Sequence, residues 1–572
     1  MKERHMLRAL VVTASLLLSS LAVAVEYINI KPLNQVVSAQ VGPVEGDVLQ
    51  VPFISWGGDI AVIHANGNNL STQANSIVSQ QGLKLKLTRE DDFAKQVQHY
   101  LKGDSPFLRG TIGMLNMAMD VISKDAKTKP IVIYKLTDSA GGDALVVKSG
   151  IKTVKDLRGK TVVLQAYGPH VDYLSRILAD AGLTFKDINV RWVKDLTGTD
   201  NSPMAALYEK DIDAAFVIIP DALALTSGGS VGTGAEDSVK GAKILLSTKT
   251  ADTVIADVYA VRSDFFKQHR DVVEKFARSL LLGQESMSNV VQQRTADSKA
   301  YEQMMRAAAK GLLDSEQALA DAEGMYQDAR HVGYDGNVKF FKNNAYPRRF
   351  AVIVKESQHG LHQVGLLQQQ QEVAQARWDY DKLKKGLSQI NVAEVPKFDE
   401  SKVAALVTQK QQQGSLDQGE LFSFEVFFKP NQKTFSAELY EDAFKKVMDL
   451  ASTYGGAIIT IEGHSDPMNY LRKRKANASR MVLGRIKQAA RNLSLSRAQE
   501  VRDNIIDFSK NKGVSLDPSQ FAVIGHGISA PKTGVCGADP CVPKTEKQWR
   551  SNMRVQFRIL QVEAESSVFR PL

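Results

Sequence analysis

Residues 152–174, KTVKDLRGKTVVLQAYGPHVDYL, contain the pattern that decides the fold of the first half of the chain. The apolar run TVVLQA is followed by a glycine-containing turn and then by apolar residues at helical spacing. The same alternation of short apolar runs and helical stretches extends over residues 51–354. Strand-helix-strand units of this kind predict an α/β fold with parallel or mixed sheets covered by helices. Because roughly 300 residues favour two sheets with separate cores, we expect a bilobed body.

The composition changes beyond this region. Apolar strands disappear between residues 356 and 420, where Gln, Lys and Glu accumulate. This favours a solvated helix followed by a tether, with a prion-like segment as the alternative. The following runs have the order strand, helix, strand, helix, strand, strand, which predicts an α+β sandwich with helices on one face of a sheet. The expected divisions are a signal peptide (1–24), a bilobed domain (25–385), a polar linker (386–418), an α+β domain (419–562) and a tail (563–572).

The start of the chain has the features of an export signal. Lys2, Arg4 and Arg8 precede an apolar run over residues 9–24 that ends in Ala-Val-Ala. Small residues at these spacings are read by signal peptidase, so we expect export and cleavage after Ala24. An uncleaved anchor is the alternative, although the run is shorter than the roughly 20 residues that span a bilayer.

The amino-acid composition restricts the class of protein and its partners. Apolar residues make up 43% and charged residues 24% of the chain, which is typical of a folded globular protein. A net charge of +9 is modest for 572 residues, so we expect no nucleic-acid partner. Cys536 and Cys541 are the only cysteines, and in an exported protein their spacing predicts a small disulfide-closed loop rather than a metal site.

Four motifs in the last third of the chain occur in a familiar order. They are GHSD (463–466), LSLSRAQEV (493–501), GHG (525–527) followed by Pro531, and NMRVQFRI (552–559). With these motifs, residues 421–560 resemble the OmpA/MotB/Pal family of the Gram-negative envelope. The resemblance implies non-covalent binding of peptidoglycan through the diaminopimelate of its stem peptide, with association to the outer membrane as a further implication. Asp466 matches the residue that binds the ligand's ammonium, and Arg497 the residue that binds its carboxylate.

The implied chemistry is sound for a zwitterionic amino-acid end. Such an end needs one carboxylate and one guanidinium facing a shared pocket, and Arg offers bidentate geometry that Lys lacks. We expect Ser494 to cap the helix that carries Arg497, so that free backbone amides also favour a carboxylate. A structural salt bridge between Asp466 and Arg497 is the alternative.

Two features depart from that family. The spacing between Asp466 and Leu493 is long, and Ala490 stands where the family commonly has Asn. The extra residues form a basic insert (470–491) between Asp466 and Leu493. This insert predicts either a site for anionic envelope polymers or lipid headgroups, or a solvated helical face. Its basic residues are Arg472, Lys473, Arg474, Lys475, Arg480, Arg485, Lys487 and Arg491.

Residues 50–289 carry a second resemblance. QVPFISWGGDIAVIHANG (50–67), the stretch 152–174 and DAAFVIIPDA (213–222) resemble periplasmic solute-binding proteins of the SsuA-like type, which bind nitrate, sulfonates or thiamine precursors. The resemblance implies a type 2 bilobed fold that binds a small, anionic solute such as phosphate, a sulfonate, nitrate or a pyrimidine between the lobes. An ABC transporter permease is the partner that it implies.

The same resemblance supplies the candidate solute-binding residues. They are Ser55, Trp56, Gly57, Asp59, Ser139, Gly141, Gly142, Tyr167, Gly168, His170 and Asp221. Free amides at a helix N-terminus bind anions electrostatically, which suits the turn at 167–170. Each residue also has a structural alternative, since Trp56 can belong to a core, His170 to a surface turn and paired glycines to tight turns.

The sequence gives little support to catalysis. It contains no His-Glu-x-x-His helix, no Gly-x-Ser-x-Gly elbow and no cysteine nucleophile, and Val154 stands where a phosphate loop needs its first Gly. We therefore expect a non-catalytic binding protein without cofactor or metal, held to peptidoglycan. An envelope scaffold or sensor that uses the solute-binding fold as an interaction module is the rival hypothesis.

Overall fold

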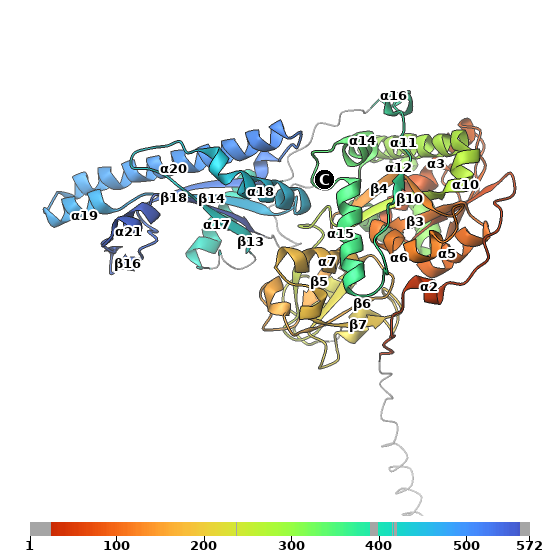
Figure 1. Cartoon of the computed structure of the whole chain (residues 1–572), viewed down its shortest axis with the longest axis horizontal. Helices are drawn as coiled ribbons and strands as arrows, with labels where there is room; N and C mark the ends of the chain where they lie inside the picture. The colour runs from red at the N-terminus through yellow and green to blue at the C-terminus, as the bar shows by residue number, and fades with distance from the viewer. Residues whose placement is uncertain (1–24, 236, 389–397, 415, 417–419, 561–572) are drawn as a thin grey trace, which may run out of the picture.

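A computed structural model describes residues 25–235, 237–388, 398–414, 416 and 420–560. Figure 1 shows two α/β lobes followed by a third unit that carries the C-terminal sheet. The predicted signal peptide and tail lie outside the described residues. Within the described ranges, no helix combines the length and the apolar character that a membrane span requires.

The first lobe is built on a mixed sheet with the order β11-β4-β10-β3, and β12 pairs with β4. β10 runs antiparallel to β3 and β4, and β1 and β2 form a separate parallel pair. The strands are β1 (Leu49–Phe53), β2 (Leu85–Arg89), β3 (Phe107–Thr111), β4 (Pro130–Ser139), β10 (Ala256–Arg262), β11 (Ala329–His331) and β12 (Ala374–Gln375). The helices are α2 (Leu33–Val36), η1 (Gly57–Asp59), α3 (Ile60–Ala65), α4 (Ile77–Gln80), α5 (Phe93–Lys102), α6 (Ile112–Ile122), α10 (Ser263–Gln268), α11 (Arg270–Gln292), α12 (Ser298–Leu313), α13 (Leu319–Asp328), α14 (Gly333–Lys342), α15 (Phe350–Gln363) and α16 (Tyr380–Leu383).

The second lobe contains a five-stranded sheet in the order β7-β6-β8-β5-β9. β6 is parallel to β7 and β8, whereas β5 is antiparallel to β8 and β9. The strands are β5 (Asp143–Val147), β6 (Thr161–Gln165), β7 (Asn189–Val193), β8 (Ala214–Ile218) and β9 (Lys243–Ser247). The helices are η2 (Val154–Leu157), α7 (His170–Asp180), η3 (Phe185–Asp187), α8 (Pro203–Ala206) and α9 (Ile219–Leu225). The two sheets confirm the predicted bilobed α/β body.

The stretch 152–174 folds as its pattern predicts. Val162, Val163 and Leu164 are fully buried in β6, as expected for a parallel strand covered on both faces. Gly159, at φ +74°, adopts a left-handed conformation that favours glycine just before the strand. After the turn, α7 buries Val171, Leu174 and Ile177 at helical spacing.

The C-terminal unit has a four-stranded sheet in the order β13-β18-β14-β15. β14 and β15 are parallel, and β18 is antiparallel to β13 and β14. Its elements are β13 (Glu420–Phe427), η4 (Ala437–Tyr440), α18 (Glu441–Thr453), β14 (Ile458–His464), α19 (Met468–Lys475), α20 (Arg480–Asn511), η5 (Pro518–Gln520), β15 (Phe521–Gly527), β16 (Val535–Cys536), β17 (Asp539–Pro540), α21 (Glu546–Ser551) and β18 (Arg554–Leu560). One face of the sheet packs against α18 and α20, which bury Phe444, Val447 and Val501.

The linker prediction needs revision. Residues 400–412, inside the predicted linker 386–418, form α17 (Glu400–Gln412), which packs on β15. Val403 and Val407, spaced by one helical turn, are buried with Phe398 and Ile458. This i, i+4 apolar pair was hidden by the surrounding glutamines, so a helix of the C-terminal unit was assigned to a tether.

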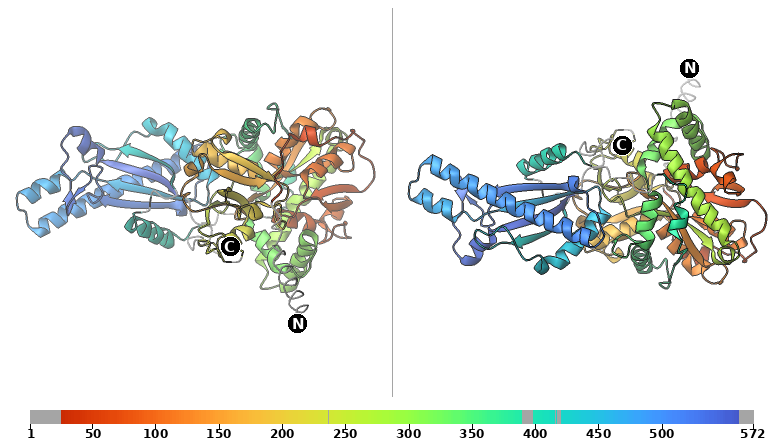
Figure 2. Two further views of the ribbon diagram at one scale, coloured as in Figure 1. Left: turned by 90° about the horizontal axis from the view of Figure 1, so that it is seen from below. Right: turned by 90° about the horizontal axis from the view of Figure 1, so that it is seen from above.

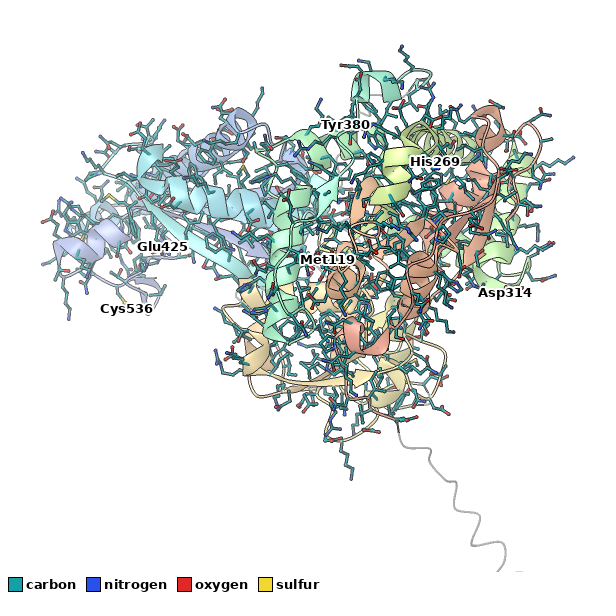
Figure 3. All side chains as sticks on the ribbon, turned by 45° about the vertical axis from the view of Figure 1, so that its right-hand side comes forward. Met119, His269, Asp314, Tyr380, Glu425 and Cys536 are labelled. Carbon is teal, nitrogen blue, oxygen red and sulfur yellow. A yellow bond between two sulfur atoms is a disulfide. The ribbon has the colours of Figure 1, made fainter. Side chains whose placement is uncertain are left out.

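The predicted disulfide is confirmed. Cys536 and Cys541 are bonded and close the β16–β17 hairpin, which lies near the outer end of the C-terminal unit (Figure 3). The basic insert forms α19 and the first half of α20, and these lie at the end of the molecule farthest from the lobes (Figure 2). Its Arg and Lys side chains are exposed there, which agrees with a solvated helical face.

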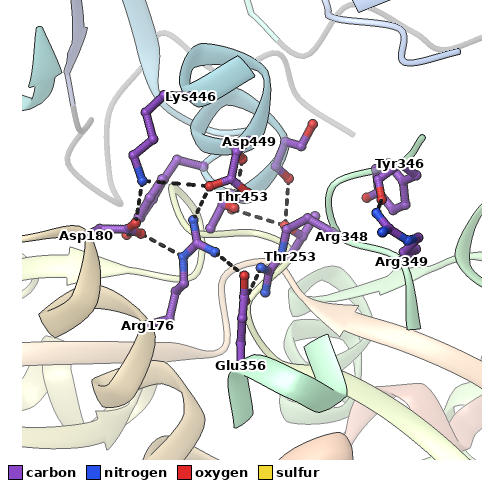
Figure 4. A network of polar contacts seen from close by, with 12 residues as sticks. Arg176, Asp180, Thr253, Tyr346, Arg348, Arg349, Glu356, Lys446, Asp449 and Thr453 are labelled. Atoms are coloured by element: carbon purple, nitrogen blue, oxygen red, sulfur yellow. Dashed lines mark hydrogen bonds and ion pairs between the residues drawn. The ribbon is translucent and has the colours of Figure 1, made fainter. Parts of the chain in front are cut away.

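The C-terminal unit is joined to the second lobe by a polar network (Figure 4). Arg176 of α7 forms ion pairs with Asp180 at 2.7 Å, with Glu356 of α15 at 2.9 Å and with Asp449 of α18 at 2.9 Å. The Tyr454 hydroxyl donates a hydrogen bond to Asp180 at 2.7 Å. One arginine therefore connects the second lobe, α15 and the C-terminal unit.

Candidate functional site

The first lobe contributes the turn before α3 to the interlobe region. Ser55 is exposed and bonds Asp91 through its backbone N–H, at 2.7 Å, and through its hydroxyl. The indole N–H of Trp56 donates to Thr137 Oγ1 at 3.1 Å. The far edge of the same indole lies against Gly142, where a Cβ would come within 2.5 Å of it. Trp56 therefore reaches from the first lobe to the crossover between the lobes.

Gly57 and Asp59 are already engaged by other parts of the first lobe. A Cβ at Gly57 would lie 1.8 Å from the carbonyl oxygen of Met325, so α13 lies directly on this turn. Asp59 is fully buried and accepts from Arg109 Nη2 at 2.7 Å, while Arg109 Nη1 donates to Asp257 at 2.8 Å. Burial raises the pKa of Asp59 to about 6, although Arg109 opposes the shift. This carboxylate belongs to a buried ion cluster.

The crossover residues form a hydrogen-bonded hinge. Thr248 Oγ1 accepts from the backbone N–H of Gly141 and of Asp143, both at 3.1 Å, and lies 2.8 Å from Ser139 Oγ. Ser139 also donates to Asp143 at 2.6 Å, and the other oxygen of that carboxylate is 2.7 Å from His170 Nε2. His170 is fully buried, so its ring holds α7 to the hinge instead of lying in a surface turn.

Three further candidates lie in the second lobe, two in the turn before α7 and one in α9. Tyr167 has a φ of +58°, and its hydroxyl donates to Lys31 O at 2.7 Å. Gly168 packs against Gln165, whose Oε1 would be 2.2 Å from a Cβ at that position. Asp221 is half-buried in the first turn of α9, and burial raises its pKa although Thr197 opposes the shift. Its Oδ2 has no hydrogen-bond partner among the described residues.

The sequence prediction missed Asp172. Its carboxylate lies over the N-terminus of α6 in the opposite lobe, where a Cβ at Gly113 would be 2.1 Å from Asp172 Oδ2. Ser357 of α15 donates to Asp172 Oδ1 at 2.9 Å. Burial raises the pKa of Asp172 to about 7, although Ser357 and Arg348 oppose the shift. A helix N-terminus favours an anion, but burial outweighs this effect at Asp172, whose carboxyl group occupies the position.

Arg497, predicted from the C-terminal motif, is buried with no countercharge among the described residues. It is 1% exposed, and within the part of the chain that the structure describes its guanidinium donates to three backbone carbonyls: Gln432 at 2.8 Å, Lys429 at 3.1 Å and His464 at 3.3 Å. The ring of Phe428 lies 5.0 Å from the guanidinium carbon. Burial lowers the pKa of Arg497 to about 10. Such a cation is costly to bury and favours an incoming anion.

Asp466 lies at the end of the neighbouring strand, two residues beyond His464. Its Oδ1 accepts from the backbone N–H of Met468 at 2.8 Å, and its Oδ2 has no hydrogen-bond partner among the described residues. Burial raises the pKa of Asp466, although Met468 N–H opposes the shift. Across the described chain, no ion pair joins Asp466 to Arg497, so the structural salt bridge considered above is absent there.

The helix that carries Arg497 begins earlier in the sequence than predicted. α20 begins at Arg480 with Ser479 as its N-cap, so Ser494 lies inside the helix. Ser494 Oγ instead accepts from the backbone N–H of Gly527 at 2.9 Å. A Cβ at Gly463 would lie 1.9 Å from Ser494 O, so the glycine of GHSD permits β14 to touch α20. Close backbone packing, rather than a helix N-terminus, positions Arg497.

The comparisons with known proteins concern the N-terminal body. Residues 79–290 match the family model described as NMT1/THI5 like. A stretch of 212 residues is 28% identical to the taurine-binding periplasmic protein of Escherichia coli (strain K12). That match covers 37% of this chain and 60% of the length of the taurine-binding protein. The expectation of a binding domain of this type in the N-terminal body is thereby supported.

Two solved structures are also similar to this chain. The periplasmic aliphatic sulphonate binding protein SsuA from Escherichia coli gives a TM-score of 0.40 at 14% identity, covering 57% of this chain and 91% of its own. The periplasmic nitrate-binding protein NrtA from Synechocystis PCC 6803 gives a TM-score of 0.39 at 13% identity, covering 61% and 90%.

Proposed function

We propose that this chain is an exported, non-catalytic periplasmic binding protein whose C-terminal unit holds it to peptidoglycan and whose N-terminal lobes bind a small anionic solute. The observation that carries the anchoring role is the buried guanidinium of Arg497, which bonds backbone carbonyls and pairs with no carboxylate of the described ranges. Asp466 adds an unpartnered carboxylate oxygen near the end of the adjoining strand. A zwitterionic diaminopimelate end would supply both missing charges.

Co-sedimentation of the full chain with diaminopimelate-type sacculi tests the anchor. We expect the wild type to pellet, and Asp466→Asn and Arg497→Lys to remain in the supernatant, because each removes one charge or the bidentate donor pair. Arg502→Ala is the matched control, since Arg502 lies on the same helix and pairs with Asp503 at the surface. Because the exposed basic insert attracts any polyanion, the assay is run at high salt, which screens surface charge. Equal pelleting of all four proteins would remove the proposed role of Asp466 and Arg497.

The solute-binding role is supported by the match of residues 79–290 and by the similarity to the taurine-binding protein. Taurine, other sulfonates, nitrate, phosphate and pyrimidines are therefore the ligands to test, and an ABC permease is the expected partner. A ligand at a hundredfold excess over its Kd stabilises the folded state by about 2.7 kcal/mol, so binding would raise the melting temperature. Absence of a shift with every ligand would remove this role for these compounds.

A scaffold or sensor is the second candidate, and a specific observation favours it. Asp172 already occupies the N-terminus of α6, and Met325 lies on the turn at Gly57. Both would compete with a solute for positions that attract anions. Asp172→Asn discriminates the two hypotheses, because removal of an internal competitor would strengthen solute binding but would leave a scaffold without any ligand response.

A further inference from the structure

The face of the C-terminal sheet opposite α20 carries an unusual polar cluster. Side chains alternate along a strand, so Glu462 and His464 of β14 point away from the α20 face, on which Ile461 is buried. His526 of the parallel strand β15 lies beside them, because His464 pairs in register with Gly527. Three potential metal ligands therefore meet at the carboxyl ends of two adjacent strands.

The three groups have the spacing of a shared ion. Their ligand atoms all lie within 4.8 Å of one another. His526 Nε2 and Glu462 Oε2 are 3.0 Å apart, which suits either a hydrogen bond or two ligands of one ion with bonds of about 2 Å. The imidazoles of His464 and His526 are stacked, with centroids 4.9 Å apart and an interplanar angle of 18°.

His464 supplies the second observation. It is only 3% exposed, and neither of its ring nitrogens has a hydrogen-bond partner among the described residues. The backbone of Ala530 lies near the ring without reaching hydrogen-bond geometry. A buried polar group without a partner destabilises the folded state and requires an explanation. We propose that Glu462, His464 and His526 bind one divalent transition-metal ion, with water in the fourth position.

The surrounding residues orient Glu462 for this role. Thr460 Oγ1 donates to Glu462 Oε1 at 3.1 Å, and Arg558 Nε lies 3.3 Å from the same oxygen. The other oxygen, Oε2, therefore faces His526. Partners of this kind fix the direction of metal-ligating carboxylates in known sites. Two imidazoles and one carboxylate suit Zn²⁺ better than Ca²⁺ or Mg²⁺, which prefer oxygen alone.

Positively charged side chains near the cluster limit its affinity for a metal cation. Arg558 and Arg554 lie close to the cluster, and both would repel a cation. Each has an acidic partner, however: Arg558 pairs with Glu420 at 3.4 Å, and Arg554 pairs with Glu425 at 3.1 Å. The local charge is therefore nearly balanced, and an ion that binds through imidazole nitrogens is favoured over one held by charge alone.

The ion would also stabilise the strand end that contacts Arg497. The carbonyl oxygen of His464 accepts a hydrogen bond from Arg497 Nη1 at 3.3 Å, while the side chain of His464 lies on the opposite face of the sheet. Fixing this ring would fix the strand end that precedes Asp466. The metal site itself does not depend on peptidoglycan binding.

Zinc binding to the untagged, chelator-stripped full chain tests the proposal by isothermal titration. We expect one Zn²⁺ per wild-type chain, and at least tenfold weaker binding by His464→Ala, His526→Ala and Glu462→Gln. His99→Ala is the matched control, since His99 is exposed and pairs with Asp104 elsewhere, and it should bind as the wild type does. Both cysteines are joined in the disulfide, so no thiol competes for zinc.

A second measurement guards against misfolded variants. Zinc should raise the melting temperature of the wild type and leave that of His526→Ala unchanged; His526 is the most exposed of the three ligands, so its variant is the most readily tolerated. The proposal is overturned if the wild type takes up no zinc, or if His464→Ala and His526→Ala bind it as tightly as the wild type.

Discussion

Arg109 and its acidic partners in the first lobe form a buried ion cluster, whereas the buried guanidinium of Arg497 in the C-terminal unit has no acidic partner among the described residues. In the lobes, Asp59 and Asp257 share Arg109, and Asp143 holds His170. In the C-terminal unit, Arg497 has no acidic partner and Asp466 keeps one carboxylate oxygen unpartnered within the described chain. Internally satisfied charges stabilise a fold, whereas an unsatisfied pair of opposite sign marks a place prepared for a ligand. The comparison therefore makes Asp466 and Arg497 the better candidates for ligand binding.

The largest expected effect follows from removing the shared arginine of the lobes. Arg109→Met leaves Asp59 and Asp257 buried without their countercharge, and breaking a buried pair in this way costs about 3–5 kcal/mol. Thermal unfolding of the variant should show a large loss of melting temperature in the N-terminal body. Arg158→Met, which removes a surface partner of Asp187, should cost about 0–1 kcal/mol. Similar losses in both variants would contradict the contrast drawn between buried and exposed pairs.

The next effect is pH-dependent and concerns Asp172. Its pKa of about 7 in the folded protein lies above the ordinary value of 3.8, so the folded state holds the proton more tightly than the unfolded state between about pH 4 and pH 7. The stability associated with this group is therefore present below pH 4 and is lost as the pH rises to 7. Asp172→Asn should stabilise the protein at pH 8 by on the order of 2–4 kcal/mol and have little effect at pH 4.

The neighbours of Asp172 make this prediction specific. Arg348 and Ser357 favour the charged form, whereas Glu356 and burial favour the neutral form. Unfolding curves recorded at pH 4 and at pH 8 on the same preparations would measure the difference. A gain at pH 4 equal to that at pH 8 would mean that titration of Asp172 does not explain the effect.

A smaller loss of stability is expected from replacing Arg497. Arg497→Met removes three hydrogen bonds to carbonyls but also removes a buried, unpaired cation, so the net cost should be at most about 1–2 kcal/mol. Sacculus binding should nevertheless be lost. If this variant were destabilised as strongly as Arg109→Met, the arginine would serve the fold and the comparison between the two regions would fail.

The sequence predicted the parts of the fold that follow from periodicity. The alternation around residues 161–174 gave β6 and α7, and the spacing of Cys536 and Cys541 gave the disulfide. The start of α20 was misplaced because residues 480–493 lack an apolar stripe and continue the helix on the far side of Ser494. α17 was missed because only Val403 and Val407 form its buried face among many glutamines.

Candidate residues were harder to predict than elements. Trp56 and Ser139 were candidates through the resemblance to solute-binding proteins, but their hydrogen bonds to Thr137 and Thr248, which lie far away in the sequence, could not be predicted. Asp172 was overlooked because its role depends on contact with Gly113 in the other lobe. The local signal for Asp172 was its position as an acidic residue in the first turn of α7, and such residues are common at helix starts.

The smallest effect concerns the junction, where the two regions meet. Thr253 Oγ1 donates to Ser452 O at 2.6 Å and approaches Thr453 O at 3.2 Å, so the return crossover of the hinge is bonded directly to the end of α18. Thr253→Val keeps the shape but removes this donor, which should cost about 1 kcal/mol. Because the same crossover includes Thr248, the loss should appear in the unfolding of both the lobes and the C-terminal unit. Thr199→Val, at an exposed turn of the second lobe, is the control. A change confined to one transition would mean that the two regions unfold independently.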